Sequence, residues 1–307
     1  EPYTTYYTKD QYKALMESAS GKYSGIGVVV TQNVQTGIVS VVRPFPGSPG
    51  EEAGIQKDDY VIKVGDHEVT DQDLNEVVSW IKGEEGTTVD IELYRPSEER
   101  YLTVTATRRI IEIQEVEYRM LDNNVGYIEI LEFEELTSKQ FNSAIDDLEA
   151  QGMESLIVDL RDNPGGLVDQ ATAILDRFLP AERLLVYTED KNGEKDELFS
   201  EDDVTFDKPF VVLINGNSAS ASEIVAGAIR DYDLAELVGT QSFGKGIVQY
   251  IMPLTDGSAV KVTAAKYYSP EGINIHGTGI EPDVVVEDDL DTEEDEQLEK
   301  AIEILTG

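Results

Sequence analysis

The chain has 307 residues, with 24 Lys and Arg against 62 Asp and Glu, and therefore a formal net charge of -38. A charge of this sign and size repels nucleic acid and anionic membranes, which argues against both as partners. The absence of cysteine excludes disulfides, thiolate catalysis and zinc–cysteine sites. The length is enough for two domains or for one large domain with an inserted module, and a hydrophobic fraction of 40% indicates a globular chain.

The first residues predict little regular structure. Residues 1–23 are polar and aromatic, with a short helix expected over Gln11–Ser18, and they belong either to the core or to a truncated helical region. No window approaches the roughly 18 consecutive apolar residues of a membrane span. Because the chain begins at Glu1 without a signal-like apolar segment, we expect that a leading segment has been removed.

Residues 24–108 predict a mainly-β module. Its first strand covers Ser24–Thr31 and is bounded by glycines. One helix, with Thr70 and Asp71 as candidate caps, is predicted from apolar residues at helical spacing, namely Leu74, Val77, Val78 and Ile81. The further strands are expected over Ile38–Arg43, Asp59–Val64, Thr88–Leu93 and Tyr101–Thr107.

Residues 109–287 predict a larger α/β region, and residues 288–307 an acidic C-terminal helix. The strands Ser155–Arg161 and Pro209–Asn215 are almost continuously apolar, so both of their faces need cover. The helices that alternate with them are expected over Ser138–Gln151, Leu167–Phe178 and Ser218–Arg230.

Three segments of this region could carry chemistry. In the first, Asn215–Ile224, a helix opens directly after a buried strand, so one serine hydroxyl can lie at the helix N-terminus, where free N–H groups favour developing negative charge. A structural alternative is that Ser220 and Glu223 form a capping box, or that Ser218 alone caps the helix.

The second segment is the Pro–Gly–Gly turn after Asp159, which ends at Gly166. Glycines permit positive φ and leave N–H groups exposed, so the turn could form half of an oxyanion hole, although ordinary strand-to-helix turns share the pattern.

In the third segment, Lys245 stands between two glycines, and burial there would lower its pKa toward that of a general base.

Two other catalytic readings are weaker. Residues 239–245 have the spacing of a phosphate loop, but Gly246 replaces the required Ser or Thr, and Ile247–Leu254 reads as a strand where a helix is needed. A Ser–His–Asp triad has only two histidines to draw on: His67 in a turn of the N-terminal module and His276 in a glycine-rich stretch.

The three segments, in this order and behind the N-terminal module, resemble the C-terminal processing peptidases, also called tail-specific proteases. The match runs from about Tyr3 to Val286, and its most specific parts are Arg161–Gly166, Ser218–Ile224 and Phe243–Gln249, joined by Gly25–Val28 and Gly47–Ile55. The resemblance implies an α/β fold: a crotonase/ClpP-like α/β protease core over 109–287, with an inserted mainly-β PDZ domain over 24–108.

The family's roles carry over onto residues of this chain. By the resemblance, Ser220 is the nucleophile of a serine endopeptidase, Lys245 its general base, and Gln249 holds the lysine in place. Gly166 and Ala221 would supply the oxyanion N–H groups. No metal or other cofactor is implied.

The resemblance also implies how substrates are chosen. Protein or peptide substrates with free C-terminal tails would add a strand to the PDZ-like module, with the carboxylate held by the loop of Gly25, Ile26 and Gly27. It further implies a place on a bacterial cell envelope, in the periplasm or outside the cell, and leaves open a homodimer and a regulatory or adaptor protein as partners.

Two functions of other classes remain open. One is a non-catalytic PDZ scaffold or regulatory binding protein, for which the Ser220→Ala change would have no effect. The other is a thioester-processing enzyme on a related crotonase-like core, although no segment resembles an adenine or pantetheine site.

Overall fold

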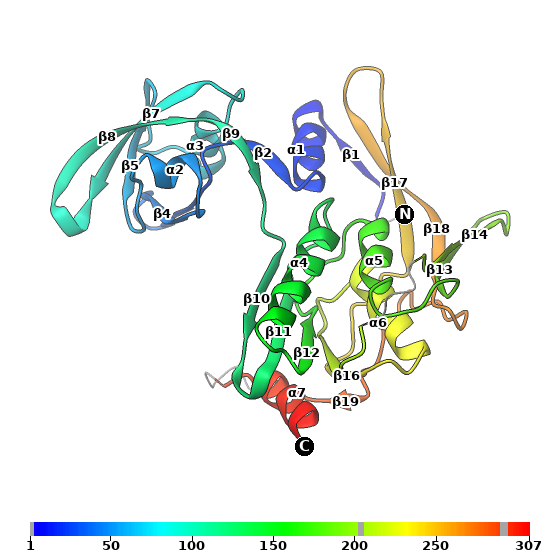
Figure 1. Ribbon diagram of the computed structural model, residues 1–307. Coiled ribbons are helices and arrows are strands. Elements are labelled where there is room, and N and C mark those ends of the chain that lie inside the picture. Colours follow the sequence, from blue (N-terminus) through cyan, green and yellow to red (C-terminus); the bar gives the residue numbers. More distant parts are fainter. Residues whose placement is uncertain (1–2, 202–205, 289–293) are drawn as a thin grey trace. The chain divides into compact units, whose positions relative to one another are not determined.

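The computed structural model describes residues 3–201, 206–288 and 294–307 (Figure 1). Contacts divide the chain into two compact units. The small unit consists of Lys22–Ile113, and the core unit consists of residues 1–21 and 114–307. The small unit is therefore an insertion near the N-terminus of the core unit.

The small unit is built on an antiparallel sheet in the order β3–β4–β5–β7–β8, with β6 paired to β5, and on a separate pair of β2 and β9. Two helices, α2 (Pro49–Glu52) and α3 (Leu74–Ile81), accompany the sheet. The strands are β2 (Lys22–Gly25), β3 (Val28–Gln32), β4 (Val39–Pro44), β5 (Tyr60–Val64), β6 (His67–Glu68), β7 (Thr88–Arg95), β8 (Arg100–Thr107) and β9 (Arg109–Glu112).

The single strand predicted over Ser24–Thr31 is wrong, because the chain turns between β2 and β3. Gly27 has φ +69°, and a Cβ on it would lie 2.5 Å from the Ser48 Cβ. Its carbonyl accepts hydrogen bonds from the Ser48 hydroxyl at 2.9 Å and from the Phe45 N–H at 2.8 Å. A positive φ is incompatible with a continuous strand, so glycine ends one ladder and opens the next.

The helix of the small unit lies where the apolar spacing predicts it, but its predicted caps are wrong. Asp73 is the N-cap of α3, and its carboxylate accepts from the Asn75 N–H at 2.8 Å. Asp71 instead has φ +62° in the preceding turn. The helix buries Val77 and Ile81 in the core of the unit.

The core unit holds a six-stranded sheet in the order β10–β11–β12–β15–β16–β19, parallel except for β10. Every residue of β12 and β15 is buried, as the continuous apolar runs predict. The strands are β10 (Val116–Met120), β11 (Val125–Ile130), β12 (Ser155–Asp159), β15 (Phe210–Ile214), β16 (Glu236–Gly239) and β19 (Val284–Val285).

A second sheet of the core unit has the order β1–β18–β13–β14, and β17 pairs with β18 along most of that strand's length, from Ala259 to Lys266. Its long hairpin of β17 and β18 stands out in Figure 1. The strands are β1 (Thr5–Tyr7), β13 (Leu184–Asp190), β14 (Lys195–Phe199), β17 (Ile247–Pro253) and β18 (Ala259–Tyr268).

Helices cover both faces of the parallel sheet. α4 (Thr137–Ala150), α5 (Val168–Leu175) and α6 (Ala221–Asp231) pack into one large apolar cluster with the sheet, whereas α7 (Glu296–Thr306) packs into a separate cluster with other side chains of the same strands. α1 (Lys9–Ala19) precedes the small unit. The predicted α/β class is confirmed, because neighbouring side chains of each parallel strand point to opposite, covered faces.

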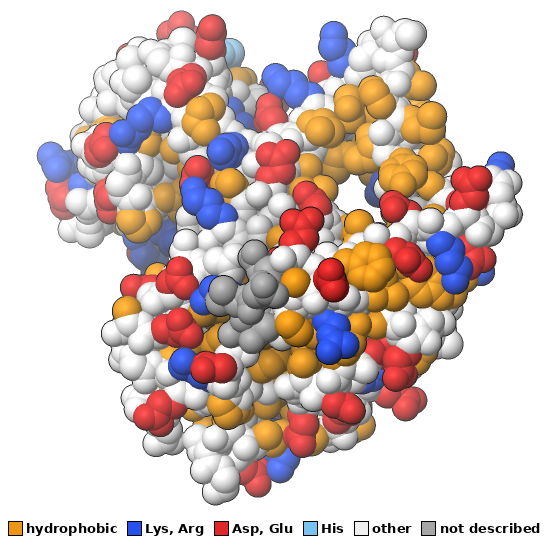
Figure 2. All heavy atoms as spheres, turned by 45° about the vertical axis from the view of Figure 1, so that its right-hand side comes forward, with side chains coloured by type: hydrophobic (Ala, Val, Ile, Leu, Met, Phe, Trp, Pro, Cys, Tyr) orange, Lys and Arg blue, Asp and Glu red, His pale blue; other side chains and the backbone are white. Residues whose placement is uncertain are grey.

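Many acidic side chains are exposed on the face of the protein that Figure 2 shows. Figure 2 shows acidic side chains scattered over the face in view among basic and uncharged ones, rather than gathered into one patch. This distribution favours solubility over recognition of one strongly basic partner.

Candidate active site

Ser220 lies in the turn between β15 and α6. Its backbone has φ 55° and ψ -112°, a conformation that residues other than glycine rarely adopt and that recurs at functional sites. Ser218 does not cap the helix, because its hydroxyl accepts from the Asn215 N–H in the preceding turn and donates to the Leu160 carbonyl just after β12. The helix therefore begins at Ala221, three residues later than predicted, with Ser220 at its N-terminus.

Within the described ranges, two backbone N–H groups near Ser220 donate to no acceptor. Among the described residues, Gly166 and Ala221 have no hydrogen-bond acceptor for their N–H groups. Their neighbours differ: the Gly165 N–H donates to Asn163 Oδ1 at 2.8 Å, and the Leu167 N–H donates to the Phe133 carbonyl at 2.6 Å. Two such N–H groups, one of them at a helix N-terminus, can stabilise an oxyanion.

Hydrogen bonds of Asn163 fix the loop that carries Gly166. Asn163 is fully buried, its amide donates to the Ile130 carbonyl at 2.7 Å, and its own carbonyl accepts from the Ala219 N–H and the Ser222 hydroxyl. The glycine turn and the serine turn, about 55 residues apart in the sequence, are thereby locked together.

Lys245 lies in the loop between β16 and β17, and the glycines on either side let that loop pack tightly. A Cβ on Gly244 would lie 2.9 Å from the Gly279 nitrogen, and one on Gly246 would lie 2.7 Å from the His276 nitrogen. Burial lowers the pKa of Lys245, the charge of Lys261 lowers it further, and Glu223 opposes both. A strand and not a helix follows the loop, which agrees with rejecting a phosphate loop.

One cavity of the core unit, about 250 Å³ in volume, brings four predicted residues together. They are Gly166, Ser220, Lys245 and Gln249, and Ala221 is the next residue after Ser220. The walls are largely apolar, as expected for a site that excludes water around reacting groups. The remaining lining residues are Leu15, Ala19, Glu134, Pro164, Leu167, Val168, Ile224, Ile247, Val248, Ile251, Lys261 and Tyr267.

Gln249 makes a hydrogen bond away from the lysine. Its side-chain amide donates to the carbonyl of Tyr3 at 2.9 Å, which fixes the start of the described chain to β17. Gln249 thus lines the same cavity as Lys245, while its amide group binds the backbone of Tyr3.

Three ionisable residues that the sequence patterns did not predict line the cavity. The Tyr267 hydroxyl donates to the Ser220 carbonyl at 3.0 Å, and burial raises the pKa of this phenol. Burial and the nearby Glu132 and Glu115 raise the pKa of Glu134 to about 7. Lys261 faces the same cavity. No local motif marks these residues, because each reaches the site from a distant part of the chain.

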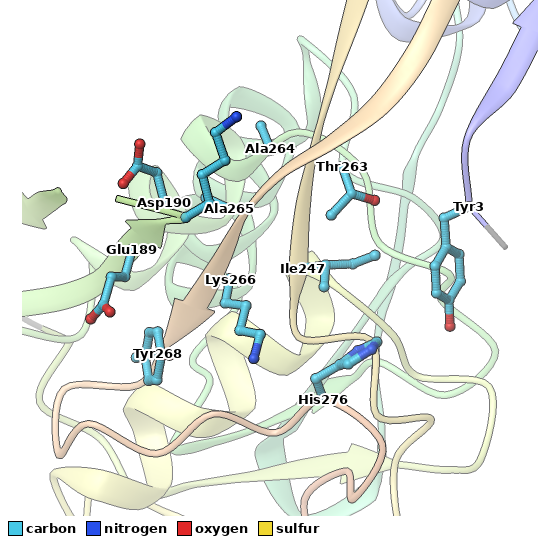
Figure 3. A pocket seen from close by; sticks show the side chains of 11 residues that line it. Tyr3, Glu189, Asp190, Ile247, Thr263, Ala264, Ala265, Lys266, Tyr268 and His276 are labelled. Atoms are coloured by element: carbon cyan, nitrogen blue, oxygen red, sulfur yellow. The ribbon is translucent and has the colours of Figure 1, made fainter. Parts of the chain in front are cut away.

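Neither histidine lines this cavity. His276 is exposed and lines another pocket, where its ring meets that of Tyr3 edge-on and lies near Lys266 (Figure 3). In the small unit, His67 stacks on Trp80 with ring centroids 4.4 Å apart. The structure thus gives neither histidine the position that a base for Ser220 requires.

The predicted carboxylate loop lies in the small unit, at the turn between β2 and β3. The carbonyls of Ile26 and Gly27 are bound within the unit, the first by the Gly50 N–H at 2.7 Å. In the described part of the chain, the N–H groups of the same two residues donate to no acceptor. Gly25 ends β2, opposite Arg109. Free N–H groups at such a turn suit a peptide carboxylate.

Within the residues described, no group of His, Asp and Glu has the arrangement of a metal site. Nor does any described helix have both the length and the apolar character needed to cross a membrane.

Two family models match the chain. Residues 124–286 match peptidase family S41, and residues 40–95 match a PDZ domain. The first match contains every residue of the cavity argued above to carry chemistry, and the second lies within the small unit.

Curated relatives carry matching names. The chain is 37% identical to the carboxy-terminal-processing protease of Bartonella bacilliformis, over 94% of this chain and 67% of that protein. It is 39% identical to the carboxy-terminal processing protease CtpA of Bacillus subtilis, over 94% of this chain and 61% of that protein. It is 35% identical to the carboxyl-terminal-processing protease of Synechocystis, over 100% of this chain and 74% of that protein. The chain thus spans about three fifths to three quarters of the length of these relatives.

Solved structures of similar fold also include a C-terminal processing protease. The photosystem II D1 C-terminal processing protease aligns with a TM-score of 0.57 and 28% identity, covering 100% of this chain and 83% of that one. The tricorn protease shares the fold alone, with a TM-score of 0.52 at 18% identity over 92% of this chain and 29% of its own. Fold and likeness together define a serine protease that carries a PDZ domain. The chain belongs to peptidase family S41 and is similar to its carboxy-terminal processing proteases.

Proposed function

We propose that this protein is an endopeptidase that cleaves peptide bonds through Ser220 and Lys245 and selects substrates by their C-terminal tails. The observation that carries the catalytic part is the single cavity that contains Ser220, Lys245 and Gly166. A lowered lysine pKa and two unused N–H groups support it.

The proposed chemistry has two halves. Neutral Lys245 accepts the proton of Ser220 while the serine oxygen attacks the scissile carbonyl, and the N–H groups of Gly166 and Ala221 stabilise the oxyanion. The lysine then gives its proton to the leaving amine, which departs and leaves an ester on Ser220. Water, activated by the same lysine, hydrolyses the ester and frees the acid and the serine. Gln249 would limit the movement of Lys245 from β17.

Cleavage of an internally quenched peptide with a free C-terminus tests the catalytic part. We compare the wild type with Ser220→Ala and Lys245→Ala, and with Lys13→Ala as a control, because Lys13 is 78% exposed on α1. We expect activity in the wild type and the control only. Equal activity in Lys245→Ala would remove that lysine as the base. Cleavage unaffected by Ser220→Ala would remove that serine as the nucleophile, whereas no cleavage by any variant, wild type included, would favour the non-catalytic scaffold.

The second part of the proposal concerns the small unit. A substrate tail would pair with the edge of β3, against α3, and the N–H groups at Gly25, Ile26 and Gly27 would bind its carboxylate. The support is the PDZ match and the unused N–H groups of Ile26 and Gly27.

Tail recognition can be tested by binding alone. The 307-residue chain with Ser220→Ala should bind a fluorescent peptide with a free C-terminus at least tenfold more tightly than the same peptide amidated. Gly27→Ala should lose this preference, because the new Cβ would meet Ser48. Gly37→Ala is the matched control, since Gly37 has a similar φ of +70° with open space around it. Equal binding of both peptides by Ser220→Ala would contradict tail recognition.

The family likeness also supports a place outside the cytoplasm, in the periplasm, cell envelope or medium, and either a homodimer or a regulatory or adaptor protein as partner. Fractionation of the native cells tests the location. Light scattering of the purified protein tests the dimer.

A further inference from the structure

The side chain of Glu223 contacts both halves of the proposed catalytic pair. Its Oε2 accepts from the Ser220 N–H at 2.8 Å and from the Lys245 N–H at 2.9 Å. Its Oε1 accepts from the Gly244 N–H at 2.7 Å and from the Ser242 hydroxyl at 2.6 Å. One carboxylate thus binds the serine turn with one hydrogen bond and the lysine loop with three.

The hydrogen bonds to Glu223 suit an ionised carboxylate. Glu223 is 2% exposed, and all four hydrogen bonds are donated to it, three of them by backbone N–H groups. An ionised carboxylate accepts hydrogen bonds at both oxygens and donates none. A capping box requires only the bond to Ser220, so the three bonds to the lysine loop are not explained by capping the helix.

We propose that Glu223 is a positioning residue that sets the distance between Ser220 and Lys245 by binding the backbones of both segments, and that Lys261 balances its charge at the lysine. This inference rests on the proposed function. It assigns a mechanical and an electrostatic role to one buried side chain on the first turn of α6.

The electrostatic role follows from the groups around Lys245. Glu223 faces it from α6, Lys261 and Tyr267 from β18, and Glu134 from the segment before α4. The negative charge of Glu223 favours the ammonium form of Lys245, and the positive charge of Lys261 favours the free amine. The free amine is the form that takes the serine proton, so the rate rises with pH through the pKa of Lys245.

Glu223→Gln is the direct test. Glutamine offers one acceptor oxygen and one NH₂ group, and the NH₂ group would face N–H donors. We expect kcat for the quenched peptide to fall by about a hundredfold, because small displacements of reacting groups have effects of this size, with KM changed much less. Loss of the negative charge lowers the pKa of Lys245, so the rising limb of the pH profile should move to lower pH.

Lys261 provides an independent test with the opposite sign. In Lys261→Met the rise of the cleavage rate with pH should occur at higher pH than in the wild type. At still higher pH the rate should reach the wild-type value. In Lys261→Arg, which keeps the charge, the limb should stay in place. This pair keeps the inference falsifiable if Glu223→Gln fails to fold, which circular dichroism and thermal unfolding would reveal.

The outcomes separate the inference from the function on which it rests. If the wild type cleaves nothing, the proposed function fails and the inference with it. If the wild type cleaves and Glu223→Gln loses rate only in proportion to lost folded protein, with an unmoved limb, Glu223 is merely structural. An unmoved limb in Lys261→Met would overturn the electrostatic role alone.

Discussion

Gly165 lies directly against Ser220: a Cβ on Gly165 would come within 2.7 Å of the Ser220 Cβ and within 2.7 Å of the Ala219 carbonyl oxygen. The φ of Gly165 is +104°, which also disfavours any side chain. The glycine turn therefore does more than expose N–H groups, because it lets the oxyanion loop and the serine turn touch.

The first prediction concerns this contact. Gly165→Ala should reduce kcat/KM by at least about a hundredfold, since the two turns must separate and the oxyanion N–H groups move with them. The matched control is Gly152→Ala. Gly152 has φ +94° but open space around it, so it reports the cost of the backbone conformation alone. Similar activity losses in both variants would show that the contact is unimportant.

The second prediction concerns the strain at Ser220. Its φ of 55° and ψ of -112° suit glycine better than any residue with a Cβ. Both Ser220→Gly and Ser220→Ala lose the hydroxyl, but the glycine variant should be the more stable by about 1 kcal/mol, after the larger entropy of its unfolded chain is counted. Calorimetric unfolding of the two variants measures the difference. An alanine variant of equal or greater stability would show that the turn is unstrained.

The third prediction is a pH dependence of stability. Burial and the charge of Glu132 raise the pKa of Glu115 to about 7 from its usual 4.5. The folded chain then holds this proton more firmly than the unfolded chain, so the penalty of ionising Glu115 grows as pH rises from about 4.5 to 7 and is complete above 7. Glu115→Gln should raise the unfolding temperature at pH 8 and hardly change it at pH 4.

A suitable control for this experiment is Glu154→Gln, since Glu154 is exposed and directly precedes β12. At pH 8 the gain for Glu115→Gln should amount to about 1 to 3 kcal/mol. Equal effects of both substitutions, or a gain that is the same at pH 4 and pH 8, would contradict the buried and raised carboxyl group.

The fourth prediction concerns the small unit. Asp59 is fully buried, and its two oxygens accept from Arg95 Nε and Nη2, both at 2.8 Å. Arg95→Met would leave that carboxylate without its cation, which costs about 3 to 5 kcal/mol for a buried pair, so the small unit should unfold at a much lower temperature. Arg100→Met is the control, because the Arg100 side chain is 57% exposed and should matter little. The core unit should keep its own transition.

Much of the fold could be predicted from local pattern. The buried strands β12 and β15 appear as apolar runs, and α3 appears as apolar residues at helical spacing, because burial of a strand or a helix face repeats along the chain. The errors lie at element ends. The β2–β3 break depends on Ser48, and the start of α6 depends on a bond from Ser218 to Leu160, which are contacts between distant residues.

For the candidate site, local patterns singled out the segments of Ser220, Gly166 and Lys245, and the resemblance of the ordered motifs to a known family then assigned the roles of these residues and added Gln249. The cavity that gathers them, and the entry of Glu134, Lys261 and Tyr267 into it, came only from the tertiary structure.

Glu223 illustrates why sequence spacing predicts some contacts and tertiary packing decides others. Its place three residues after Ser220 marks it as a capping residue, because one helical turn brings those positions together. Its three bonds to residues 242–245 arise only once β16 and the following loop have packed beside α6, about 20 residues further along the chain. A contact within one helical turn can be predicted from the spacing of residues in the sequence. A contact between distant segments depends on how the whole sheet packs around them.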